Sequence, residues 1–180
     1  FWGTVYGMND VTHLGLYDIP MMANIPNLVY LAPTCKKEYF AMLDWSIEQN
    51  EFPVAIRVPC NGVISSEKEV ERDYSNLNKF KVEEKGNKVA IIALGDFFEI
   101  GRSVLKGLKE ELGISATLIN PRYITGLDEE CLEDLKQDHD IVITLEDGML
   151  EGGFGEKIAS FYGTSDMKVK AEGPKSKLGR

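Results

Sequence analysis

The chain has 180 residues, of which 43% are hydrophobic and 27% are charged. These proportions are typical of a globular protein and exclude a wholly disordered chain, and the length fits one large domain or two small ones. With 29 acidic and 20 basic residues the net charge is -9. We therefore expect no nucleic-acid partner, because an acidic surface repels phosphate backbones.

The sequence carries no signal for a membrane or for secretion. No apolar run approaches the ~18 residues that a membrane helix needs, so we expect no membrane contact. The N-terminus has neither the basic region nor the apolar region of a signal peptide, and it lacks a start methionine. We expect a chain cut from a longer protein. The three cysteines (Cys35, Cys60 and Cys131) form no metal-binding pattern, which favours the reducing cytoplasm.

The first part of the chain predicts a parallel strand–helix–strand unit. Apolar runs at 28–33 and 53–59 read as buried strands bounded by prolines. Between them, 35–49 has helical periodicity, with Thr34 as the expected N-cap. The side chains expected on the buried face of this helix are Tyr39, Phe40, Leu43 and Ile47. Two strands joined by a crossover helix pair in parallel.

The chain then divides. A polar, charged stretch without apolar periodicity predicts a linker over 63–79, which separates a first block, 1–62, from a second block, 80–180. The second block alternates strands with helices. The strands are expected at 88–94, 115–120 and 141–146, with a further one from 167, and the helices at 97–112, 129–137 and 156–162. Gly113 is the expected stop of its helix and Asp128 the expected cap. The fold class is α/β, with two consecutive blocks of mostly parallel sheet.

One loop carries the best candidate for chemistry. His13 stands in a glycine-containing loop, where an imidazole donates or accepts a proton near neutral pH. The neighbouring Asn9, Asp10 and Thr12 offer hydrogen bonds to a polyhydroxylated substrate. The alternative is a loop histidine that only satisfies nearby backbone groups, and spacing alone favours this alternative.

Three other features have plainer interpretations. The glycine cluster 152–155 is expected to allow close packing of a helix on a sheet, because it lacks the spacing of a phosphate-binding loop. Glu146 and Asp147 are expected at a solvated strand end. His139 is expected in a surface turn. We expect no metal site, since only two histidines are present.

The order of the motifs resembles the transketolase family, and most closely the 1-deoxy-D-xylulose-5-phosphate synthases. The first block carries Thr12-His13-Leu14-Gly15, Ile25-Pro26-Asn27-Leu28-Val29 and Pro53-Val54-Ala55-Ile56-Arg57-Val58-Pro59. The second carries Asn120-Pro121-Arg122-Tyr123-Ile124 and Leu145-Glu146-Asp147 with Gly152-Gly153-Phe154-Gly155. The resemblance implies the end of a pyrimidine-binding domain followed by a transketolase C-terminal domain.

The resemblance also implies an activity. Enzymes of this family use thiamin diphosphate and Mg²⁺ to transfer a two-carbon unit, here from pyruvate to an aldehyde such as glyceraldehyde 3-phosphate. His13 matches the family histidine that contacts the substrate and transfers protons. The residues that hold the cofactor lie upstream in the family, so this chain is expected to need those domains, in the same or another chain, and to work as a homodimer on a small-molecule substrate.

Two positions depart from the family pattern. Asn9 stands where the family has an aspartate, and Cys60 stands where it has a phosphate-binding arginine. A neutral thiol does not replace a bidentate guanidinium, which leaves the aldehyde acceptor open. Arg57 matches the family's preceding arginine and is expected to be structural. Two alternatives remain: a transketolase or the beta subunit of a 2-oxo acid dehydrogenase, and an interaction module without chemistry.

Overall fold

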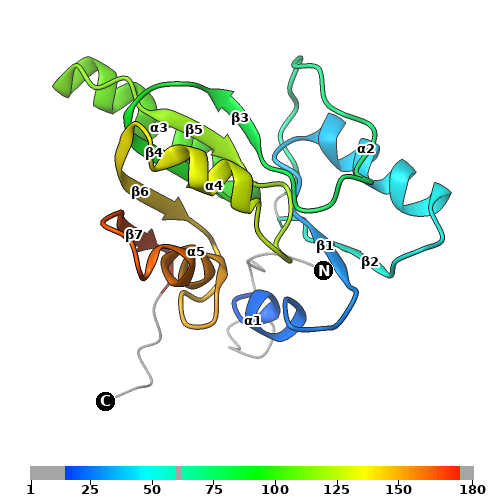
Figure 1. Cartoon of the computed structure of the whole chain (residues 1–180). Coiled ribbons are helices and arrows are strands. Elements are labelled where there is room, and N and C mark those ends of the chain that lie inside the picture. The colour runs from blue at the N-terminus through cyan, green and yellow to red at the C-terminus, as the bar shows by residue number, and fades with distance from the viewer. Residues whose placement is uncertain (1–14, 60–61, 175–180) are drawn as a thin grey trace.

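The computed structural model describes residues 15–59 and 62–174 (Figure 1). In these ranges the chain forms a two-stranded sheet and a five-stranded sheet, each with helices packed on it. None of the helices in the described ranges has the length and apolar character needed to cross a membrane.

The N-terminal block is a parallel strand pair covered by one helix. Its elements are α1 (Asp18–Met22), β1 (Val29–Leu31), α2 (Lys36–Glu48) and β2 (Val54–Ile56). β1 and β2 pair in parallel, as the crossover helix requires. Met42 and Trp45 of α2 pack in one core with Val29 and Leu31. Residues 62–79 contain no helix or strand, yet their Tyr74 is buried in this same core.

The C-terminal block is an α/β sheet in the order β3-β5-β4-β6-β7. Its strands are β3 (Lys81–Glu84), β4 (Lys88–Ala93), β5 (Thr117–Asn120), β6 (His139–Leu145) and β7 (Lys168–Glu172). Its helices are η2 (Gly95–Phe97), α3 (Phe98–Leu112), α4 (Glu129–Leu135) and α5 (Phe154–Tyr162). Four strands are parallel, and β3 is an antiparallel edge strand.

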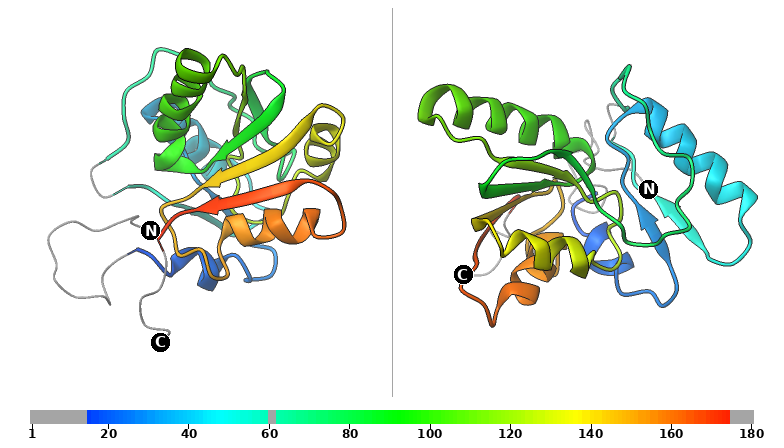
Figure 2. Two further views of the ribbon diagram at one scale, coloured as in Figure 1. Left: turned by 90° about the vertical axis from the view of Figure 1, so that its left-hand side faces the viewer. Right: turned by 45° about the horizontal axis from the view of Figure 1, so that its top comes forward.

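The helices cover both faces of this sheet. Figure 2 shows α3 on one face and α4 with α5 on the other. The sequence of β4 explains the arrangement, because alternate residues of a strand point to opposite faces. Ile91 packs in the core on the α3 side, whereas Ala90 and Ile92 pack with residues of α4 and α5. A strand buried on both faces needs the continuous apolar run that this segment has.

The two blocks are joined by backbone pairing. After β5 the chain runs back along β1, where Leu31 and Tyr123 form an antiparallel bridge. The Ile124 N–H donates to the Tyr30 carbonyl at 2.7 Å, and the Ala32 N–H donates to the Arg122 carbonyl at 2.8 Å. β1 is therefore paired on both sides.

The structure confirms the predicted α/β class, the parallel pairing in the first block and the strand–helix alternation in the second. Gly113 ends α3 with φ of 68°, and Asp128 caps α4, both as expected. Strand β3 was not predicted. The Thr34 cap is wrong by one residue, because Cys35 holds the N-cap position and Thr34 instead donates to Glu38 at 2.8 Å.

The predicted inner face of α2 is also wrong. Phe40 is 48% exposed and Ile47 is 73% exposed, whereas Ala41, Met42 and Trp45 are buried. The buried face is rotated around the helix axis, because Glu38 turns inward to meet Thr34 and Asn120.

Candidate functional site

A buried group of charges lies where the carboxyl ends of β2 and β6 meet. Arg57, directly after β2, donates from Nε to Oδ2 of Asp18 at 2.7 Å and from Nη1 to Oδ1 of Asp147. The three side chains are only 4%, 6% and 3% exposed. The hydroxyl of Tyr30 also donates to Asp18, at 2.6 Å. Burial alone would lower the pKa of Arg57, but the charges of Asp147 and Asp18 outweigh it and raise that pKa.

Glu146 continues this group toward the N-terminus of α5. It is fully buried, and its two carboxylate oxygens accept the N–H groups of Gly155 at 2.7 Å and Phe154 at 2.9 Å. A carboxylate satisfies the free amides there and complements the helix dipole. Burial nevertheless raises the pKa of Glu146 to about 7. We call Asp18, Tyr30, Arg57, Glu146 and Asp147 the Arg57 cluster.

The expectation of a solvated strand end is therefore wrong for Glu146 and Asp147, because the N-terminus of α5 covers Glu146 and Arg57 pairs with Asp147. The packing role of the glycine cluster is confirmed. A Cβ at Gly155 would lie 2.5 Å from Thr144 Oγ1 and 3.1 Å from Glu146 Oε1. Only glycine lets α5 approach the end of β6 this closely.

The loop candidates lie just beyond the described residues. His13, Asn9, Asp10 and Thr12 fall in 1–14, and Cys60 falls in 60–61, so their roles stay predictions. The described residues begin at Gly15, two residues after His13. There the Gly15 carbonyl accepts from Arg57 Nη2 at 2.8 Å, and the Leu16 carbonyl accepts from the Met149 N–H at 2.8 Å. The Arg57 cluster thus touches the segment that carries the predicted site.

A second buried arginine, Arg122, holds the linker against the second block. Arg122 donates from Nε to the Lys79 carbonyl at 3.0 Å and from Nη1 to Glu71, and it lies over the ring of Tyr74. Asn120 accepts the Arg122 N–H at 3.0 Å and donates to Glu38 at 2.9 Å. We call Glu38, Glu71, Tyr74, Asn120 and Arg122 the Arg122 cluster. It contains only structural contacts.

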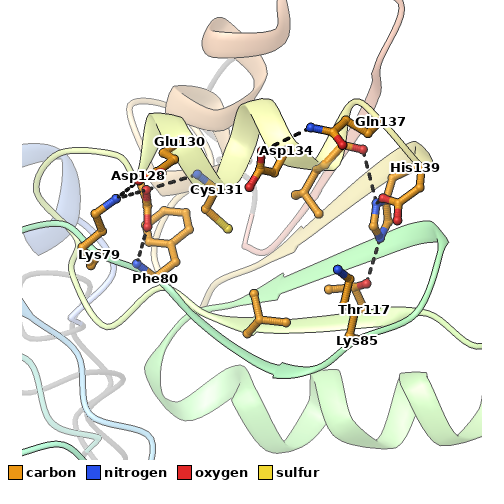
Figure 3. Close-up of a pocket in the computed structure, with 13 residues that line it drawn as sticks. Lys79, Phe80, Lys85, Thr117, Asp128, Glu130, Cys131, Asp134, Gln137 and His139 are labelled. Atoms are coloured by element: carbon orange, nitrogen blue, oxygen red, sulfur yellow. Dashed lines mark hydrogen bonds and ion pairs between the residues drawn. The ribbon is translucent and has the colours of Figure 1, made fainter.

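A pocket of about 510 Å³ lies between β3 and α4, and none of the residues that line it belongs to the Arg57 cluster (Figure 3). At one end Lys79 pairs with Asp128 at 3.1 Å and with Glu130 at 2.6 Å. Cys131 also lines the pocket, but burial raises the pKa of its thiol to about 11. A thiol with a raised pKa is a poor nucleophile.

His139 lies at the other end of this pocket and is itself buried, with 7% exposure. Its Nε2 is 2.8 Å from Thr117 Oγ1, and its Nδ1 is 2.6 Å from a carboxylate oxygen of Asp138. The surface-turn interpretation of His139 is therefore wrong. Because Lys79 and His139 are both engaged by protein partners, the pocket offers no activated group, and we place the candidate functional site at the strand ends.

The described residues do not fit thiamin diphosphate or Mg²⁺. Across 15–59 and 62–174 no three His, Cys, Asp or Glu side chains are placed to hold a metal ion. Asp18 and Asp147 pair with Arg57, although Oδ2 of Asp147 has no hydrogen-bond partner among the described residues, and Glu146 accepts two backbone amides.

Known proteins resemble the chain over both blocks. The 1-deoxy-D-xylulose-5-phosphate synthase of Lachnoclostridium phytofermentans is 34% identical over 168 residues, which cover 91% of this chain and 26% of the relative. The synthase of Alkaliphilus oremlandii is 39% identical over 152 residues, which cover 83% of this chain and 24% of the relative. The chain thus spans about a quarter of the length of these curated relatives.

Solved structures share the fold. A split-gene transketolase, described as an inactive beta4 tetramer, superposes with a TM-score of 0.77 at 24% identity, covering 90% of this chain and 53% of that one. Transketolase from Campylobacter jejuni superposes with a TM-score of 0.72 at 17% identity, covering 98% of this chain and 26% of that one. Residues 78–178 match the family model of the transketolase C-terminal domain. The chain belongs to the transketolase family, with 1-deoxy-D-xylulose-5-phosphate synthases among its relatives.

Proposed function

We propose that this chain is part of a thiamin diphosphate-dependent transferase that acts as a 1-deoxy-D-xylulose-5-phosphate synthase. The reaction joins the two-carbon unit of decarboxylated pyruvate to an aldehyde. The observation that carries the proposal is the extent of the match. Synthases with this name align with 91% of the chain, well beyond residues 78–178 of the C-terminal domain model, so the alignment includes most of the first block.

Within this function the loop residues deal with the substrate. His13 transfers protons to and from the reacting group, because imidazole is the side chain best matched to that task near neutral pH. Asn9, Asp10 and Thr12 hydrogen-bond the substrate hydroxyls. Thiamin diphosphate and Mg²⁺ are held by residues outside the described ranges, in the same or another chain, in a cytoplasmic homodimer.

The acceptor aldehyde is less well defined by the sequence than the two-carbon donor. Cys60 follows Pro59 at the position where the resemblance places a phosphate-binding arginine. A charge-assisted bond to phosphate contributes roughly 1.5–3 kcal/mol. We therefore propose weaker selection for a phosphorylated aldehyde than an arginine would give, so glyceraldehyde competes with glyceraldehyde 3-phosphate.

The test is aldehyde-dependent release of CO₂ from pyruvate by the enzyme that contains this chain, with thiamin diphosphate and Mg²⁺ supplied. We expect release with pyruvate and little turnover with a ketose phosphate donor. His13→Gln should abolish it, whereas His139→Gln, at the only other histidine, should retain it. Preference for a ketose phosphate would instead indicate a transketolase, and transfer to a lipoyl carrier would indicate a 2-oxo acid dehydrogenase.

A non-catalytic module is the second candidate. One solved relative in fold is described as a split-gene transketolase in an inactive tetramer, and this chain matches about half of it. Supplying the missing domains separates the two ideas. Turnover of pyruvate with them present would exclude a pure interaction module, and a stable homodimer that never supports turnover, even with its missing domains supplied, would favour it.

A further inference from the structure

We propose that Arg57, held by Asp18 and Asp147, is a positioning residue that fixes the carboxyl end of the loop carrying His13. The inference rests on the proposed function for the role of His13. It goes beyond that function by assigning a task to a buried ion-pair cluster and to the loop after β6.

All three nitrogens of the Arg57 guanidinium are used, in three directions. Nε meets Asp18 at 2.7 Å, Nη1 meets Asp147, and Nη2 meets the Gly15 carbonyl at 2.8 Å. The first two bonds hold the plane of the group, and the third is directed to the main chain two residues after His13. A planar fork is needed to span these partners, and the single ammonium of lysine does not reproduce it.

The loop after β6 holds the same segment from a second point. Its Asp147 pairs with Arg57, and its Met149 N–H donates to the Leu16 carbonyl at 2.8 Å. A third point is Asp18 itself, which opens α1 and is bonded by Arg57 and Tyr30. Gly15, Leu16 and Asp18 are thus tied to groups from β1, β2 and the β6–α5 loop.

Stability alone does not account for this arrangement. A fully buried ion pair contributes little net stability, because desolvating the charges offsets their attraction, and apolar side chains of the same volume do as well. What the charges add is a defined direction for each bond. Catalysis depends on precise placement, because a small displacement of a reacting group slows turnover strongly.

Hydrogen–deuterium exchange on the full 180-residue chain tests the inference without any activity. We compare Arg57→Lys with Arg122→Lys, which alters an equally buried arginine that also bonds a backbone carbonyl but does not contact Gly15. The reporter is the Met149 amide, which is bonded to Leu16. We expect its exchange to rise about tenfold in Arg57→Lys, through local opening, and to stay unchanged in Arg122→Lys.

Equal acceleration in both variants, or none in Arg57→Lys, would overturn the inference. Should Arg57→Lys fail to fold, Asp147→Asn takes its place, because it removes one of the two acidic charges that hold Arg57 and keeps the arginine. The same faster exchange of the Met149 amide is expected in Asp147→Asn, and exchange at the wild-type rate would contradict the inference.

Kinetics of the enzyme that contains the chain add the catalytic readout. Arg57→Lys should lower kcat by about 100-fold, as expected for a misplaced reacting group, with the KM for pyruvate little changed. Arg122→Lys should retain kcat. A wild-type enzyme with no aldehyde-dependent turnover would reject the proposed function. The exchange experiment tests independently whether Arg57 holds the segment after His13.

Discussion

Both buried arginines link segments that are far apart along the chain: Arg57 joins the two blocks, and Arg122 joins the second block to the linker. Arg57 pairs with two acids that are 6% and 3% exposed, whereas the acid that pairs with Arg122 is 54% exposed. The remaining bonds of Arg122 go to the Lys79 carbonyl, far from the histidine loop in sequence. The comparison shows that one junction is an internal charge network beside a predicted site, and the other is a structural link open to water.

The largest difference is expected when each arginine loses its charge. Arg57→Met leaves Asp18 and Asp147 buried without a cation, which costs about 3–5 kcal/mol in the free energy of unfolding. Arg122→Met leaves Glu71 able to face water, so the expected loss is about 1–3 kcal/mol. Urea unfolding of the two variants measures both values. Equal losses would show that the two junctions are energetically alike.

The next largest effect is expected in the pH dependence of stability. The pKa of Glu146 is raised by burial from 4.5 to about 7 in the folded state. The folded protein therefore holds a proton that the unfolded chain releases, and the contribution of Glu146 to stability falls as pH rises between these two values. The expected fall is about 2–3 kcal/mol.

Glu146→Gln removes this titration. The measurement is urea unfolding of wild type and Glu146→Gln from pH 4.5 to just above pH 7, the range between the two pKa values. Subtracting the variant cancels the other acids, so the difference in unfolding free energy should decline across the range. A difference that stays constant with pH would mean that Glu146 keeps an ordinary pKa.

The smallest expected effect is the difference in stability loss when the tyrosine of each cluster is replaced by phenylalanine. Tyr30 donates to the Asp18 carboxylate at 2.6 Å, and Tyr74 donates to a backbone carbonyl at 3.1 Å. Hydrogen bonds to charged groups are worth more, so Tyr30→Phe should cost about 1.5–3 kcal/mol and Tyr74→Phe about 0.5–1.5 kcal/mol. Thermal unfolding at fixed pH compares them. A larger loss in Tyr74→Phe would contradict the assignment of the stronger network to Arg57.

Apolar periodicity predicted most of the fold but little of the candidate site. β4 and β6 were predictable because their apolar runs are long and bounded by turn residues. β3 was not, because Lys81-Val82-Glu83-Glu84 is an edge strand with only one apolar side chain. The buried face of α2 was predicted wrongly because Glu38 is buried and accepts a hydrogen bond from Asn120, which is distant in sequence.

The burial of Glu146 and Asp147 was missed for a similar reason. Charged residues at a strand end are usually exposed to solvent. Here Arg57, 90 residues away from Asp147 along the chain, pairs with Asp147, and the N-terminus of α5 covers Glu146. A signal was present in the isolated arginine that closes the apolar strand before Pro59. A lone cation that is buried at the end of an apolar strand requires an acidic partner, although the sequence does not say which one.

The most direct measurement of the central claim is the fate of pyruvate labelled with ¹³C at its keto carbon, followed by NMR in the enzyme that contains this chain, with glyceraldehyde 3-phosphate present. Our account predicts that the label appears as the ketone of a 1-deoxyketose, bonded to the former aldehyde carbon, and that His13→Gln prevents this. Label that remains in pyruvate, or that leaves only as acetaldehyde or acetate, would contradict it.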